Sequence, residues 1–162
     1  VTEAEQQWPQ ALWDILEEAA LPRTWIAESS GGVGANWADG LAVINTLMGM
    51  AVDIEKRQSV IGNNQGGLSG PAIKPIALLK VHQVYQISKH HNVPIIGQGG
   101  ITSAKDALEF IIAGAAAVGV GTALFYDPLI CPKINQGISD YLGEHRIENV
   151  ADLVGTLELH CS

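Results

Sequence analysis

The sequence is poor in the residues and runs that mark several common classes of protein. It has two cysteines, Cys131 and Cys161, in no Cys-x-x-Cys or Cys/His arrangement, so we expect neither a zinc or other metal site nor a disulfide framework. No apolar run approaches the roughly 18 residues of a membrane span, and no signal peptide is evident, so no membrane contact is expected. Nine basic residues against 17 acidic ones give a formal charge of −8, which argues against nucleic acid as a partner. These absences together predict a cytoplasmic protein.

Glycine, by contrast, is abundant, and two glycine-containing turns are the most informative feature of the chain. They are Gly99-Gly100, after the apolar run Val93 to Gly97, and Gly121-Thr122, after the apolar run Ala116 to Val120. Glycine lets backbone N–H groups approach a phosphate closely, and a following helix adds the positive end of its dipole. Either pair alone could be an ordinary tight turn. Together they predict one phosphate cradle, formed by Gly99, Gly100, Gly121 and Thr122.

The remaining pattern alternates strands and helices. Ser103 can cap a helix that Gly114 ends. Further expected elements are a buried strand over Gly40 to Asn45, a hairpin over Val52 to Ile61, a polar loop over Gly62 to Gly70, and helices over Pro71 to Lys89, Pro132 to Leu142 and Val150 to Leu157. This order predicts an α/β fold with a parallel sheet. A complete (β/α)8 barrel needs about 250 residues, so the 162 residues present can form only part of one.

Two further segments follow predicted strands, at what would be the carboxyl edge of a barrel, where such enzymes carry their chemistry. Asn45 and Thr46 follow a predicted strand, and their amide and hydroxyl groups suit a planar ligand with amide and carboxylate groups. A simple strand-end cap is the alternative. Residues 66–75, Gly-Gly-Leu-Ser-Gly-Pro-Ala-Ile-Lys-Pro, place three glycines before a helix start, where N–H groups can face an anion or a flavin ring. An ordinary capped loop is the alternative there.

In order and spacing, these segments resemble the dihydroorotate dehydrogenase family. The resemblance runs from about Ala38 to Val154 and rests on Asn45 to Met50, Gly66 to Pro75, Ile95 to Ile101, Gly119 to Ala123, Asp127-Pro128 and Cys131 to Ile134. It points to the NAD-linked class, whose catalytic subunit holds FMN and works with an electron-transfer subunit that carries FAD and a 2Fe–2S cluster. It therefore implies the C-terminal half of a TIM barrel, oxidation of dihydroorotate to orotate in pyrimidine biosynthesis, and a homodimeric full-length protein.

Position by position, the resemblance implies a set of site residues. Asn45 and Thr46 match the pair that binds the pyrimidine substrate. The FMN contacts match Ile44, Gly70, Gly99, Gly100, Gly121 and Thr122, of which the last four surround the phosphate. In the family, dihydroorotate gives a hydride to the flavin while a cysteine base removes a proton from the adjacent carbon.

The chain also departs from the family pattern. The base cysteine belongs to the first half of the barrel and has no counterpart here, and we interpret Cys131 as structural. The flavin-contacting lysine that precedes the Asn-Thr pair is also missing, since Lys56 is the first lysine of the chain. We therefore divide the chain into residues 1–37, a divergent helix (Thr2 to Ala20) and glycine-rich loop, and residues 38–162, the half-barrel.

The resemblance thus predicts a truncated dehydrogenase that lacks its catalytic base and is inactive alone. One alternative is a non-catalytic half-barrel that binds FMN or another phosphorylated ligand. An inert fragment is the other.

Overall fold

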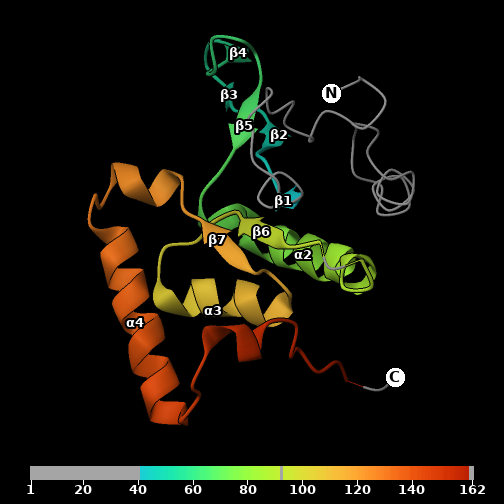
Figure 1. The fold of residues 1–162 in the computed structure, drawn as a ribbon. Helices are drawn as coiled ribbons and strands as arrows, with labels where there is room; N and C mark the ends of the chain where they lie inside the picture. Colours follow the sequence, from blue (N-terminus) through green and yellow to red (C-terminus); the bar gives the residue numbers. More distant parts are fainter. Residues whose placement is uncertain (1–40, 92, 161–162) are drawn as a thin grey trace, which may run out of the picture.

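The computed structural model describes residues 41–91 and 93–160 of the chain (Figure 1). Three parallel strands form a sheet in the order β1-β6-β7. They are β1 (Leu41–Val43), β6 (Ile95–Gln98) and β7 (Ala117–Gly119). Each coincides with an apolar run that the sequence marks as a strand, so the predicted parallel sheet is confirmed. The helix expected over Thr2 to Ala20, the loop that follows it and Cys161 lie outside the described residues.

Helices join these strands and follow the last of them. They are η3 (Pro71–Ile73) and α2 (Lys74–Ser88) before β6, α3 (Ala104–Ala113) between β6 and β7, and η4 (Thr122–Phe125), α4 (Ile130–His145) and η5 (Val150–Leu153) after β7. The two helices expected between the strands are confirmed. The helix expected from Pro132 begins at Ile130, and the segment expected as a helix to Leu157 is a short 3-10 turn that ends at Leu153.

The ends of α3 follow from its sequence. The Ser103 hydroxyl oxygen accepts a hydrogen bond from the Asp106 backbone N–H at 3.2 Å, as expected of an N-cap. Gly114 ends the helix with a φ of 125°, which favours glycine. A Cβ at this position would also overlap the Tyr85 side chain on α2. The same glycine therefore stops α3 and lets α2 pack closely beside it.

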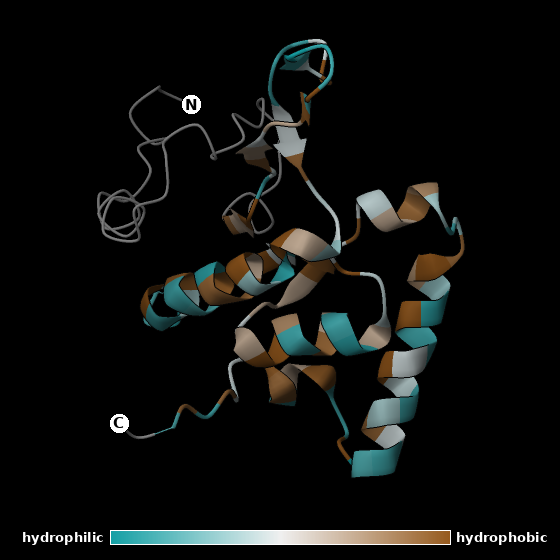
Figure 2. Ribbon diagram, turned by 180° about the vertical axis from the view of Figure 1, so that it is seen from behind, coloured by the Kyte–Doolittle hydropathy of each residue, from teal (hydrophilic) through white to brown (hydrophobic). Residues whose placement is uncertain are grey.

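The two faces of the sheet differ in burial. Leu41, Val43 and Ile95 are buried on one face, in a core that includes α2 and α3 residues. Figure 2 shows hydrophobic and hydrophilic residues alternating along α2. On the opposite face, Ala42 pairs with Ile96 and Ile96 with Ala117, and all three are exposed. In a closed barrel this face lines the interior, so the chain has the strand-and-helix pattern of a partial barrel.

A two-part arm extends from the carboxyl end of β1, away from the helices (Figure 1). It consists of the antiparallel pairs β2 (Leu47–Gly49) with β5 (Gly66–Leu68) and β3 (Val52–Asp53) with β4 (Gln58–Ser59). The expected hairpin is confirmed, but the expectation of a loop throughout Gly62 to Gly70 is wrong. Glycine disfavours strands locally, yet at Gly67 it is required because a Cβ would overlap the Thr46 side chain.

Candidate phosphate and ring site

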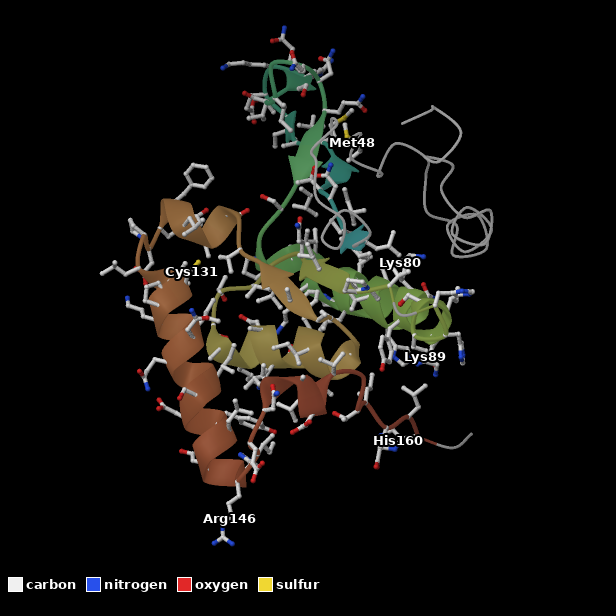
Figure 3. All side chains as sticks on the ribbon, in the orientation of Figure 1. Met48, Lys80, Lys89, Cys131, Arg146 and His160 are labelled. Atoms are coloured by element: carbon white, nitrogen blue, oxygen red, sulfur yellow. The ribbon has the colours of Figure 1, made fainter. Side chains whose placement is uncertain are left out.

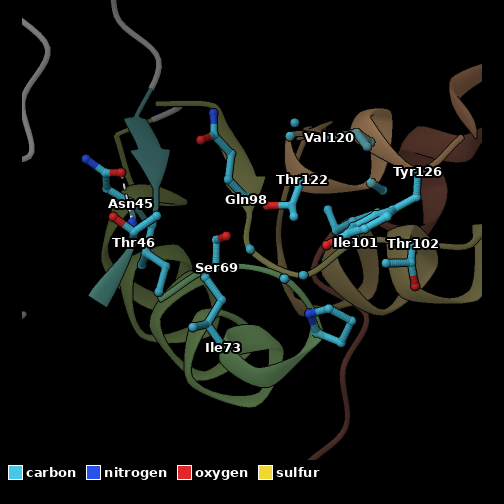
Figure 4. Close-up of a pocket in the computed structure, with 18 residues that line it drawn as sticks. Asn45, Thr46, Ser69, Ile73, Gln98, Ile101, Thr102, Val120, Thr122 and Tyr126 are labelled. Atoms are coloured by element: carbon cyan, nitrogen blue, oxygen red, sulfur yellow. Dashed lines mark hydrogen bonds between the residues drawn. The ribbon is translucent and has the colours of Figure 1, made fainter. Parts of the chain in front are cut away.

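A pocket of about 220 Å³ lies at the carboxyl ends of the three parallel strands, beside the start of α2 (Figure 4). All the site residues implied by the resemblance line it: Ile44, Asn45, Thr46, Gly70, Gly99, Gly100, Gly121 and Thr122. These residues come from segments as far apart in the sequence as β1 and η4. The structure thus brings the predicted set together, while the role of each residue stays a prediction.

The fold itself, independently of any ligand, requires glycine at positions 99 and 100. Their φ values are 130° and 75°, in the range that favours glycine. A Cβ on Gly99 would lie 2.7 Å from the Ala77 Cβ, and one on Gly100 would lie 2.6 Å from the Gly70 carbonyl oxygen. The turn after β6 therefore sits directly against the start of α2, and any side chain would force these two segments apart.

Gly121 is different, because neither a positive φ nor crowding by described atoms demands a glycine there. Its φ is −113°, and a Cβ would meet no atom within 4 Å. The residue lines the pocket, so an added side chain would take up space that a ligand could otherwise occupy. Of the four cradle residues, Gly121 is thus the one whose identity points most directly to a bound molecule.

The described residues that line the pocket carry no fixed charge. None of the 18 residues that line it is Asp, Glu, Lys, Arg or His. An anion bound there would be held by backbone N–H groups, by the Thr122 hydroxyl and by the positive end of the α3 dipole, which follows directly after the Gly99–Thr102 turn. This is the donor set of a phosphate site at glycine turns, in which hydrogen bonds rather than ion pairs bind the ligand.

Asn45 and Thr46 lie on the opposite side of the pocket from Tyr126 (Figure 4). The Asn45 side-chain oxygen accepts a hydrogen bond from the Thr46 backbone N–H at 2.8 Å. This bond is the local cap that was the alternative interpretation of the pair. It still leaves the Asn45 amide NH₂ and the Thr46 hydroxyl without a hydrogen bond to the described residues. Asn45 can therefore cap the strand end while the pair binds a ligand. Ile44 is buried, and its N–H donates to the Gln98 carbonyl at 3.1 Å.

Sequence reasoning missed several pocket residues, above all Gln98, Ile101 and Tyr126. Gln98 lies between the Asn45 side and the Thr122 side of the pocket in Figure 4. Strand periodicity could have found it, because it stands two residues after Ile96 and therefore shares the exposed face of the sheet. Tyr126, 83% exposed, lies beyond the last strand, where no periodic signal marks it.

An ionic cluster adjoins the pocket without lining it. Lys74 contacts Asp106 at 2.6 Å and Glu109 at 2.8 Å. Burial tends to raise the pKa of Asp106, but hydrogen bonds from Lys74, Thr102 and Ser103 outweigh it and hold the pKa well below its usual range. The same bonds to Asp106 and Glu109 raise the pKa of Lys74. Asp106 and Lys74 are therefore both charged near neutral pH.

Cys131 lies at the start of α4 (Figure 3). It is half-buried, packs against the main core and does not line the pocket. This placement agrees with a structural role. Within the described residues, no cluster of three metal-ligating side chains occurs, and no helix there has the length and hydrophobicity needed to cross a bilayer.

A parallel sheet with helices on one face and a pocket at its carboxyl edge defines part of a (β/α)8-barrel enzyme. Comparisons with known proteins narrow this class. The family model for dihydroorotate dehydrogenase matches residues 23–142. The chain belongs to the dihydroorotate dehydrogenase family.

Individual relatives agree with this assignment. The chain is 55% identical to "Dihydroorotate dehydrogenase B (NAD(+)), catalytic subunit" of Desulforamulus reducens and 49% identical to the protein of the same name from Phocaeicola vulgatus. Each alignment covers 84% of this chain and 44% of the relative. Among solved structures, ligand-free DHODH from Eimeria tenella matches with a TM-score of 0.61 and 33% identity, over 74% of this chain and 32% of that one.

The chain therefore spans less than half the length of the relatives it matches. The family match also begins at residue 23, earlier than the expected start near Ala38, and ends at residue 142. Because residues 1–40 lie outside the described part of the protein, the division at residue 37 stays a prediction.

Proposed function

We propose that the chain is the C-terminal half-barrel of the catalytic subunit of an NAD-linked dihydroorotate dehydrogenase, and that it binds the FMN phosphate and one side of the pyrimidine. The observation that carries this proposal is the convergence of the eight implied residues on one uncharged pocket.

The pocket fits the polar parts of FMN. The phosphate would lie on the Gly99-Gly100 and Gly121-Thr122 turns, where the absence of a side chain at Gly121 leaves room for it. Gly70 and Ile44 also line the pocket. When bound, FMN would supply the hydride acceptor for oxidation of dihydroorotate to orotate.

The chain's own contribution to the reaction is binding and orientation. The Asn45 NH₂ group can donate to a carbonyl or carboxylate oxygen of the substrate, and the Thr46 hydroxyl can donate or accept. None of the described residues that line the pocket is a carboxylate, histidine, lysine or cysteine, the side chains that most often serve as a general base. We therefore propose that the group that removes the substrate proton comes from outside the described residues, and that the chain alone does not turn over.

The proposal also includes the wider assembly. In the NAD-linked class that the chain resembles, a second subunit carries electrons from FMN to the nicotinamide. We propose an electron-transfer subunit with FAD and a 2Fe–2S cluster, a homodimer of the complete catalytic subunit, and a cytoplasmic location. A non-catalytic half-barrel that binds FMN is the second candidate, favoured by the lack of a base in the pocket.

An activity assay separates these two candidates. The chain would be fused behind the amino-terminal portion of the Desulforamulus reducens relative, with which it shares 55% identity. We expect the fusion to oxidise dihydroorotate and the chain alone to show no activity. A fusion that binds FMN but produces no orotate would favour the non-catalytic candidate. Failure to bind FMN as well would contradict both.

A further inference from the structure

The ionic cluster of Lys74, Asp106 and Glu109 joins the amino ends of two helices behind the phosphate cradle. Lys74 is the first residue of α2, and Asp106 lies in the first turn of α3. Asp106 is 8% exposed, and its Oδ1 lies 2.6 Å from the Lys74 Nζ. The Lys74 Nζ also donates to the Glu109 Oε2 at 2.8 Å. The function proposed above gives this cluster no role.

The second oxygen of the Asp106 carboxylate holds the turn itself. Oδ2 accepts hydrogen bonds from the Thr102 N–H, the Thr102 hydroxyl and the Ser103 hydroxyl, each at 2.9 Å. Thr102 lines the pocket and stands two residues after Gly100. A single carboxylate therefore connects α2 through one oxygen and the cradle turn through the other.

Backbone packing fixes the same turn from the opposite side. Gly100 sits so close to the start of α2 that a Cβ would lie 2.6 Å from the Gly70 carbonyl oxygen and 3.0 Å from the Pro71 Cα. The turn is thus held at Gly100 by contact with residues 70–71 and at Thr102 by Asp106. Its N–H groups have little freedom to reorient.

We propose that Asp106 and Lys74 are positioning residues for phosphate binding, which hold the Gly99–Thr102 turn in the arrangement that receives the phosphate of FMN. This inference rests on the proposed function. Neither residue lines the pocket, so both act through the turn rather than on the ligand.

If the cluster acted on the ligand through its charges alone, the variants would change FMN affinity in a different way from the one that positioning predicts. Replacing Asp106 with asparagine removes a negative charge near an anion site, and by charge alone this would strengthen FMN binding. Replacing Lys74 with methionine removes a positive charge and would weaken it. Positioning predicts a loss in both variants, because each breaks the link between α2 and the turn. The sign of the Asp106→Asn effect therefore separates the two mechanisms.

The test uses Asp106→Asn and Lys74→Met, with Asp140→Asn and Lys133→Met as matched controls. Both control residues are exposed on α4 outside the pocket. Dissociation constants for FMN and for riboflavin, which lacks the phosphate, are measured by flavin fluorescence. We expect both cluster variants to bind FMN about tenfold more weakly, with riboflavin affinity unchanged and the controls like the original protein. Glu109→Gln leaves Asp106 intact and is expected to lower FMN affinity less than Asp106→Asn or Lys74→Met does.

Hydrogen exchange provides a readout without flavin. Amides of residues 99–103 should exchange faster in Asp106→Asn, while those in the middle of α3 should not. Stronger or unchanged FMN binding in Asp106→Asn would overturn the inference, as would equal losses for FMN and riboflavin. If the original chain bound no FMN, the proposed function would fail. Unchanged exchange at residues 99–103 would then also reject the positioning role.

Discussion

Gly100 and Gly121 both line the pocket, but the structure predicts that an alanine destabilises the fold strongly at Gly100 and hardly at all at Gly121. At Gly100, alanine would have to adopt a φ of 75°, which costs about 1–2 kcal/mol. Its methyl group would also lie 2.6 Å from the Gly70 carbonyl oxygen, a backbone atom that cannot rotate away. Overpacking of this kind costs a further 1–3 kcal/mol or so. We therefore expect Gly100→Ala to lower the free energy of unfolding by about 2–5 kcal/mol.

Gly121→Ala lacks both penalties, because φ is negative and no described atom lies within 4 Å of the new methyl group. We expect the unfolding free energy to change by about 0.5 kcal/mol or less. Urea denaturation of the chain without flavin, followed by circular dichroism, measures both variants on one scale. A Gly100→Ala protein as stable as the original, or a Gly121→Ala protein destabilised as strongly as Gly100→Ala, would refute the packing described for the two turns.

Three further predictions concern stability and ligand binding. Folding lowers the pKa of Asp106 below its ordinary value of 3.8. The ionised carboxylate therefore stabilises the folded protein at pH values above 3.8, and this stabilisation is lost as the pH falls below 3.8. Between pH 6 and 3, the free energy of unfolding should therefore fall less in Asp106→Asn than in the original protein. The same pH dependence in both proteins would contradict the stabilising role given to the Asp106 carboxylate. Gly155→Ala should destabilise the fold, because φ is 71° and a Cβ would overlap the Tyr85 ring. Adding Tyr85→Ala should recover part of the loss in a double-mutant cycle, and strict additivity would argue against the contact. Asn45→Ala should weaken orotate binding to the FMN-loaded chain about tenfold while FMN affinity stays constant, as isothermal calorimetry can establish; a parallel loss of FMN would argue against a substrate role.

Features of the fold that depend on neighbouring residues could be predicted from the sequence. Ser103 and Gly114 mark the ends of α3 because cap chemistry acts within one helical turn. The apolar runs of β6 and β7 reveal strands because the apolar pattern is also a property of adjacent residues. The two glycine turns were expected to lie together and do line one pocket, because turns that end parallel strands meet at one edge of the sheet.

Features that depend on residues far apart in the chain could not be predicted in this way. The pairing of β2 with β5 involves Gly66 and Gly67, whose low strand propensity conceals it until the partner strand is present. The bond between Lys74 and Asp106 spans 32 residues, and each side chain alone is indistinguishable from a solvated surface charge. Tyr126 reaches the pocket only because η4 turns the chain after β7.

The most direct test of the central claim is titration of the purified chain with FMN, followed by quenching of flavin fluorescence. Gly121→Asp would put a carboxylate into the cradle. Gly62→Asp would add the same side chain in the arm, where a Cβ also meets nothing within 4 Å. The account predicts saturable micromolar binding that persists in Gly62→Asp and disappears in Gly121→Asp. Absence of saturable binding, or equal binding by the two variants, would contradict it.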